Sequence, residues 1–195
     1  TYVPTTSAAV YSPRYVTGKS GQGILIEEAS TNNCTGDFST GWTKVGTTIT
    51  QSGDIDPFGN ATAYRQVATS TVGVRSIWSR TATATAETWS IYAKKGTSAT
   101  TANVFTIYQA SLSKAFTINY DTGVITDAGG TQSSSNVTAT QVGTTGWWRI
   151  IIPMTGLTIG QIYNFYPGFP NVSATLGDYN LVCFPQQEAL PYATS

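Results

Sequence analysis

Short runs of apolar and β-branched residues, separated by clusters of Gly, Asn, Asp and Ser, constrain this chain more than any other feature. No window sustains the period of about 3.6 residues that an amphipathic helix requires. The runs predicted as strands are residues 23–27, 47–50, 63–67, 74–79, 88–93, 104–109, 115–119, 123–126, 147–152, 161–166 and 179–184. We therefore expect an all-β fold, a two-sheet antiparallel β-sandwich of jelly-roll type with about eleven strands.

Alternation with a period of two residues assigns the side chains of these runs to an inner and an outer face. The inner faces predict a core that includes Trp89, Phe105, Ile107, Trp148 and Ile150. The side chains left on an outer or concave face are Tyr92, Tyr108, Trp147 and Arg149.

The segments between the runs indicate turns, a loop and an arm. Residues 120–123 predict a tight turn in a hairpin, with Asp121 capping the turn and Gly123 at positive φ. Residues 128–146 are the most polar segment and predict a long loop with one weak edge strand. Residues 1–22 hold two prolines and little alternation, so we expect an extended arm or linker there and the sandwich over residues 23–195.

The charge of the chain limits its partners. Charged residues make up 10% of the sequence, and ten basic residues balance ten acidic ones. This balance argues against nucleic acid or an anionic membrane as a partner.

No stretch approaches the roughly 18 apolar residues that span a bilayer, so no membrane insertion is expected. A surface of Thr, Ser, Asn, Gln and Gly suits an extracellular or virion setting and neutral ligands such as glycans.

The residues needed for catalysis are scarce. Histidine is absent, which excludes Ser-His-Asp triads and the usual zinc sites. A glycosidase would need two carboxylates about 5–10 Å apart across a cleft. The acidic residues, nearly all at predicted turns or strand ends, are Glu27, Glu28, Asp37, Asp54, Asp56, Glu87, Asp121, Asp127, Asp178 and Glu188. We therefore expect no enzyme activity.

Metal and disulfide chemistry have one candidate each. Asp54 and Asp56 share a face and could ligate a structural calcium, but no third ligand is apparent, and a turn leading into Pro57 explains them equally. No other cofactor is expected. Cys34 and Cys183 lie near opposite ends of the module, which leaves open either a disulfide between neighbouring first and last strands or two buried thiols.

Glycan binding calls for flat aromatic rings against sugar C–H groups and for polar groups that reach the hydroxyls. The predicted glycan-binding residues are Tyr92, Tyr108, Trp147 and Arg149. Other aromatic residues could serve in the same way, namely Trp42, Tyr163, Tyr166 and Phe169. The alternative is that these rings are half-buried in the fold or covered by a neighbouring subunit.

Seven sequence blocks, taken in order, resemble a family of β-sandwich modules common in bacteriophage tail and fibre proteins. The blocks are residues 23–32, 37–39 with Trp42 close behind, 56–63, 87–96, 118–124, 146–150 and 187–195. Two positions depart from the family pattern. Ser30 stands where the family has Arg, and Asn33 with Cys34 replaces an apolar pair.

The resemblance implies a non-catalytic virion structural module of a tail fibre, spike or head fibre. The family shares no binding signature, so the expectation that the module binds a host cell-surface glycan depends on the aromatic residues and the neutral surface described above. Its implied partners also include other virion proteins, adjacent modules of the same chain and further copies in a homo-oligomer, expected to be a trimer. Residues 2–6 are similar to the end of the closing block, so we expect residues 1–22 to follow a preceding module. A purely architectural spacer or decoration domain, and a glycan-binding accessory module of a secreted bacterial enzyme, remain open.

Overall fold

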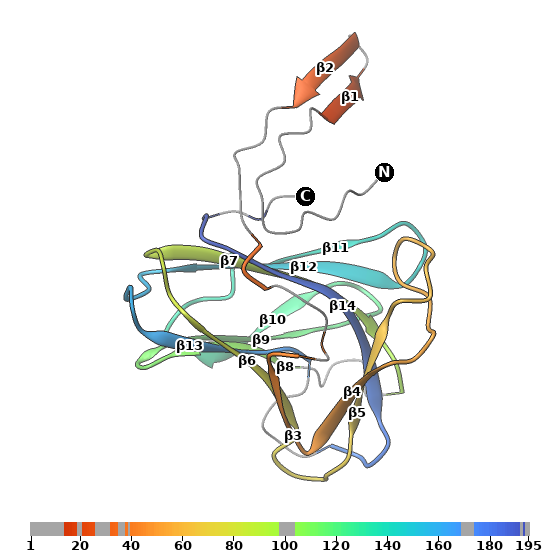
Figure 1. Ribbon diagram of the computed structural model, residues 1–195, viewed down its shortest axis with the longest axis vertical. Coiled ribbons are helices and arrows are strands. Elements are labelled where there is room, and N and C mark those ends of the chain that lie inside the picture. The colour runs from red at the N-terminus through yellow and green to blue at the C-terminus, as the bar shows by residue number, and fades with distance from the viewer. Residues whose placement is uncertain are drawn as a thin grey trace.

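The computed structural model describes residues 14–18, 21–25, 32–34, 38, 40–97, 104–168, 174–191 and 193. Every regular element in these ranges is a β-strand, and all strand pairs are antiparallel. Two six-stranded sheets form separate layers (Figure 1). The predicted β-sandwich is therefore confirmed, with twelve strands rather than about eleven.

We name each sheet after one of its central strands. The β8 sheet contains, in spatial order, β10 (Ile125–Gly130), β9 (Leu112–Ile118), β8 (Val104–Gln109), β13 (Ile162–Tyr166), β6 (Arg75–Thr81) and β3 (Trp42–Val45). The β7 sheet contains β11 (Thr138–Gln141), β12 (Trp147–Thr155), β7 (Ala86–Lys95), β14 (Tyr179–Glu188), β5 (Tyr64–Ala68) and β4 (Thr47–Gln51).

The strand connectivity is that of a jelly roll. Four nested antiparallel pairs form one long ribbon: β5 with β14, β6 with β13, β7 with β12 and β8 with β9. The ribbon is wound so that β14 also pairs with β7 and β13 also pairs with β8, which joins the pairs into two sheets. Strands β3 and β4 extend the sheets at one side, and β10 and β11 extend them at the other.

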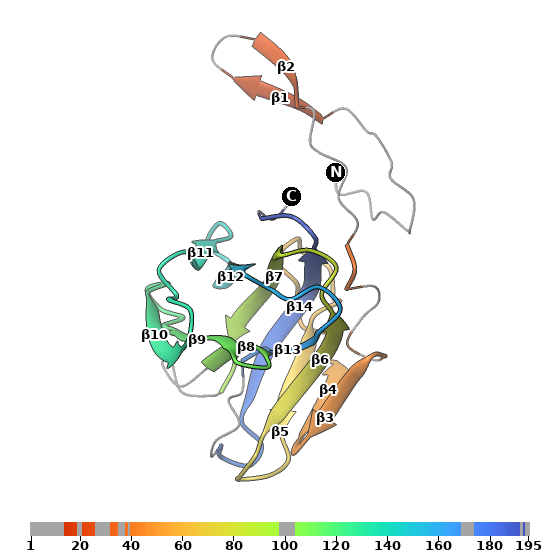
Figure 2. The ribbon, with the colours of Figure 1, turned by 90° about the vertical axis from the view of Figure 1, so that its left-hand side faces the viewer.

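Strands β1 (Arg14–Gly18) and β2 (Gly21–Leu25) form a two-stranded sheet of their own, drawn apart from the sandwich layers in Figure 2. Residues 23–25 of the strand expected at residues 23–27 therefore lie in this hairpin. Within the expected arm of residues 1–22, residues 14–18 and 21–22 are paired strand, because β1 pairs with β2 across the expected boundary at residue 22. Where the sandwich module begins stays a prediction, since residues 26–31 lie outside the described residues.

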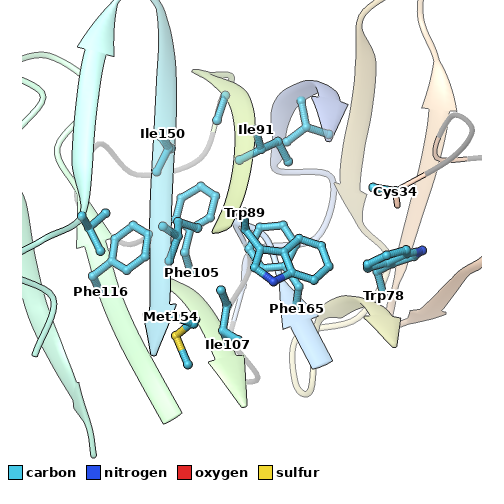
Figure 3. Packing of buried hydrophobic residues seen from close by; sticks show 14 of the residues in the cluster. Cys34, Trp78, Trp89, Ile91, Phe105, Ile107, Phe116, Ile150, Met154 and Phe165 are labelled. Atoms are coloured by element: carbon cyan, nitrogen blue, oxygen red, sulfur yellow. The ribbon is translucent and has the colours of Figure 1, made fainter. Parts of the chain in front are cut away.

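The core predicted from alternation is confirmed, since all five of its residues are buried between the sheets. Trp89 lies at its centre (Figure 3). Its ring centroid is 4.7 Å from that of Trp78, 4.8 Å from that of Phe165 and 5.5 Å from that of Tyr163. Because those three rings come from β6 and β13, Trp89 on β7 joins the two sheets.

The carboxylate of Glu87 is fully buried at the start of β7. Its Oε1 accepts hydrogen bonds from the backbone N–H groups of Thr83 (2.7 Å) and Ala84 (3.1 Å). Its Oε2 accepts hydrogen bonds from Gln187 Nε2 (2.8 Å) and from the Tyr163 hydroxyl. A buried charge is costly unless it is hydrogen-bonded in this way. Glu87 thus connects the β6–β7 turn to β13 and β14.

The turn between β9 and β10 was predicted correctly, but its capping residue was not. Gly123 adopts a φ of 73°, as expected. Asn119 rather than Asp121 caps the turn, because Asn119 Oδ1 accepts hydrogen bonds from the backbone N–H groups of Asp121 (2.9 Å) and Thr122 (3.2 Å). Further along, β11 is the edge strand that residues 128–146 were expected to contain.

The two cysteines are free thiols and both are buried. Cys34 packs in the core between the sheets, whereas Cys183 packs in a smaller cluster on the outer face of the β7 sheet. This placement on opposite sides of the β7 sheet decides against a disulfide. Burial raises the pKa of Cys34 to about 12 and also raises the pKa of Cys183.

Replacing Glu87 by Gln is expected to lower the free energy of unfolding by about 3 kcal/mol, because a neutral amide cannot accept hydrogen bonds from all of these donors. Chemical denaturation measures the change. The matched control is Asp121→Asn, since the Asp121 side chain is 64% exposed and lies 3.6 Å from Lys95. That variant should change stability by less than about 0.5 kcal/mol. Equal effects of the two variants would contradict the structural role of Glu87.

Candidate binding surface

The outer face of the β7 sheet carries an apolar cluster of its own. Ile91 and Ala93 point into the core, so Tyr92 between them points outward. The outer cluster contains the buried residues Ala63, Trp147, Leu181 and Cys183, with Tyr92, Val142, Tyr179 and Phe184 packed against them. Side chains that the strand pattern leaves outside the core therefore gather on this face.

A bulge in β14 places Phe184 in the outer cluster. Val182 packs in the core and Cys183 on the outer face, so in a regular strand Phe184 would point inward. The pairing of β14 with β7 instead shifts register between Cys183 and Gln186, and Phe184 adopts a φ of 47°. Such a backbone costs a residue other than glycine about 1–3 kcal/mol. The strained backbone at Phe184 thus places an aromatic ring on the outer face of the β7 sheet.

Three aromatic rings meet on this face, and we call them the three-ring platform: Phe58, Tyr92 and Phe184. The Phe58 ring centroid is 5.5 Å from those of both Tyr92 and Phe184, and the latter two lie 6.1 Å apart. Phe58 is 52% exposed. Arg149 lies directly opposite Tyr92 on β12, with its guanidinium carbon 6.0 Å from the centre of the Tyr92 ring. The platform thus combines aromatic surface with a cationic donor of hydrogen bonds.

The loop of residues 52–63 between β4 and β5 supplies Phe58 and covers Trp147. Trp147 lies on the outer face as predicted, yet it is only 1% exposed. Its indole Nε1 donates a hydrogen bond of 3.1 Å to the backbone oxygen of Ile55 in the loop. The expectation that Trp147 offers its ring to a ligand is therefore wrong, because a segment remote in sequence packs over it.

Asp54 and Asp56 hold this loop in place. Asp56 Oδ1 accepts hydrogen bonds from the backbone N–H groups of Phe58 (2.7 Å) and Asn60 (3.0 Å), and its Oδ2 accepts one from Thr62 Oγ1 (2.5 Å). Burial by itself raises the pKa of Asp56, but these hydrogen bonds outweigh burial and hold the pKa below its usual range. The hydrogen bond from Arg65 likewise lowers the pKa of Asp54.

The two carboxylates face donors rather than a third acidic ligand. Within the described ranges, no three His, Cys, Asp or Glu side chains come together in a group that could hold a metal ion. The alternative interpretation of Asp54 and Asp56, a turn that leads into Pro57, fits the hydrogen bonds of the loop.

Tyr108 lies on the opposite side of the molecule from the platform. It is on β8 between the buried residues Ile107 and Gln109, and it is 45% exposed on the outer face of the β8 sheet. The four predicted glycan-binding residues therefore do not form one site. Tyr92 and Arg149 are neighbours, Trp147 is covered, and Tyr108 is on another surface.

The other aromatic candidates lie elsewhere in the fold. Trp42 lies in β3 and is buried, and its four-residue strand is too short to show alternation in the sequence. Tyr163 is buried in β13, and Tyr166 is half-buried on the outer face of the same strand. Phe169 is outside the described residues.

Sequence reasoning missed Phe58 and Phe184, which make up two thirds of the platform. Phe58 follows Pro57 in a loop, where no period assigns a face. Phe184 ends the predicted strand at residues 179–184, and a bulge cannot be read from such a run. The block of residues 56–63 covers most of this loop, but it contributed to the family resemblance and did not indicate a surface.

Compared with known proteins, the chain matches no family model, and no curated protein matches it. Nor does any described residue belong to a helix that is long and apolar enough to cross a membrane.

Acid should release the loop from Trp147. The pKa values of these carboxylates are lower in the folded state than in the unfolded state, where they are about 4. Above that pH the ionised carboxylates stabilise the folded state, and the stabilisation is lost as the pH falls through their folded-state pKa values. We expect the indole N–H of Trp147 to be protected from hydrogen exchange at pH 7 and to lose protection below about pH 4. Asp56→Asn should reduce the protection at pH 7. Unchanged protection in acid, in protein that is still folded, would contradict this role of the carboxylates.

Proposed function

We propose that this chain is a non-catalytic structural module of a phage tail fibre, spike or head fibre that acts outside the cell at the virion surface and binds a host cell-surface glycan. The observation that carries the proposal is the half-exposed three-ring platform beside Arg149. Other virion proteins or adjacent modules would pack against the rest of the module.

The platform offers the two kinds of contact that a sugar needs. The exposed Phe58 ring and its neighbour Tyr92 present apolar surface to the C–H face of a pyranose ring, and the guanidinium of Arg149 can donate hydrogen bonds to hydroxyl groups. The strained backbone of Phe184 supports a functional interpretation, because strain of this kind is concentrated at binding and catalytic sites.

The charge of the chain supports a neutral ligand. Ten basic and ten acidic residues cancel, so no net field attracts a polyanion. A shallow aromatic surface gives weak affinity for each sugar, and several copies acting together would raise the overall affinity. A homo-oligomer such as a trimer is the assembly we propose for this purpose.

A purely architectural module is the second candidate. The observation that favours it is the β1–β2 hairpin, whose two strands pair with each other and with no other strand in the described part of the chain. A two-stranded hairpin is marginally stable by itself, which favours its packing against a neighbouring module or subunit. In that case the three-ring platform would be covered by the neighbour in the assembled particle.

Replacing Phe58 by Ala should weaken glycan binding about tenfold, which corresponds to about 1.4 kcal/mol. The test uses an array of bacterial surface polysaccharides together with mannan, dextran and galactan, and the tightest ligand is then titrated. Leu176→Ala is the matched control, since Leu176 is 60% exposed in the loop between β13 and β14 and should leave binding unchanged. A folded protein that binds none of these polymers would refute the glycan-binding proposal.

Replacing Phe184 by Gly should separate stability from binding. Glycine removes the strain at positive φ, roughly 1–3 kcal/mol, which offsets the packing lost with the ring. We expect the free energy of unfolding to change by less than about 1 kcal/mol, while glycan binding falls as it does for Phe58→Ala. Denaturant titration and the same binding assay provide both numbers. A loss of stability near the 3–5 kcal/mol typical of a core Phe would contradict the strain argument.

A further inference from the structure

A row of neutral side chains crosses the outer face of the β8 sheet, and we call it the Tyr108 row. The strand registers place Ser79 of β6 opposite Asn164 of β13, Asn164 opposite Tyr108 of β8, and Tyr108 opposite Ser113 of β9. Neighbouring strands lie about 4.8 Å apart, so the row extends roughly 14 Å across the sheet. One ring thus lies between an amide on one side and a hydroxyl on the other.

The chemistry of the row resembles that of a sugar-binding surface. Tyr108 is 45% exposed, which leaves much of its ring open to a ligand. Ser79 Oγ donates a hydrogen bond of 2.6 Å to Asn164 Oδ1, which holds the amide oxygen toward Ser79. The amide NH₂ of Asn164 carries two donors, and the hydroxyls of Tyr108 and Ser113 can both donate and accept.

The surroundings of the row are also neutral. Thr106 lies opposite Tyr166 on one side of it, and Thr81 lies opposite Ile162 on the other. Ile162 is 61% exposed and adds apolar surface beside the ring. None of these eight residues is charged, so the surface lacks the groups that would recognise an acidic polymer or a charged peptide. A neutral polysaccharide, with apolar C–H faces and hydroxyl edges, is the partner that matches it.

We infer that the Tyr108 row is a second glycan-binding surface and that one copy of the chain can therefore bridge two neutral glycan chains. The inference rests on the proposed function of the three-ring platform. The platform is on the outer face of the β7 sheet and the row is on the outer face of the β8 sheet, so the two surfaces point in opposite directions. The packed core between them prevents one stretch of a sugar chain from occupying both.

The first experiment maps each surface separately. Mannan, dextran and galactan oligosaccharides are titrated into isotopically labelled protein, and the backbone amide shifts are followed by NMR. We expect saturable shifts in β8 and β13 around Tyr108 as well as in β7 and β12 around Tyr92. Tyr108→Ala should remove the first set and leave the second, and Phe58→Ala should do the reverse. Tyr108→Phe, which keeps the ring, should retain binding within about threefold.

The second experiment tests bridging. Light scattering first establishes the concentration at which the protein is monomeric, and turbidity is then measured with the full-length polymer of the bound sugar. Wild-type protein should precipitate the polymer, whereas Phe58→Ala and Tyr108→Ala should each reduce turbidity at least tenfold. Leu176→Ala, outside both surfaces, should behave as the wild type.

The outcomes distinguish the two proposals. Shifts confined to the neighbourhood of Tyr92, with turbidity unaffected by Tyr108→Ala, would overturn the second surface and leave the proposed function standing. Shifts confined to the neighbourhood of Tyr108 would overturn the three-ring platform and the bridging. The absence of shifts with every sugar would refute glycan binding itself, and the bridging inference with it.

Discussion

The packing of Trp89 between the two sheets is the contact on which the other features depend. Its ring lies against aromatic rings from β6 and β13, so it fixes which face of β7 points inward. Strand alternation then places Ile91 and Ala93 in the core and turns Tyr92 outward. The position of the three-ring platform on the surface is thus a consequence of how the core is packed.

Local alternation predicted the parts of the structure that depend on a single strand. A period of two predicts the core residues of β7, β8 and β12 and the outward position of Tyr92. This prediction needs no knowledge of contacts with other segments of the chain. The burial of Trp147 could not be predicted in the same way. It depends on a loop 92 residues away whose path is set by hydrogen bonds to Asp56, and no local pattern reports such a contact.

The remaining errors have similar physical causes. Phe184 reverses the face that alternation assigns to it because β14 contains a bulge, and bulges leave no regular mark in a sequence. Glu87 appeared to be an ordinary carboxylate at the end of a strand, yet it is buried among donors from three separate segments. In each case a contact between distant parts of the chain overrides the local preference, and the candidate surface is made mostly of such contacts.

The nested pairing of the strands also has a consequence for how the molecule folds. Among the four nested pairs, only β8 and β9 are close in sequence. At the other extreme, β5 at residues 64–68 pairs with β14 at residues 179–188, more than 100 residues later. Such distant pairing slows folding, because the entropy of closing a long loop is lost before the contacts form. Strand β14 carries Phe184 and lies between β7 and β5 in the middle of the β7 sheet. This sheet is therefore incomplete until β14 has paired with both neighbours. A nascent or truncated chain that lacks β14 would therefore have neither a closed β7 sheet nor the three-ring platform, so the platform forms only when the sheet is completed.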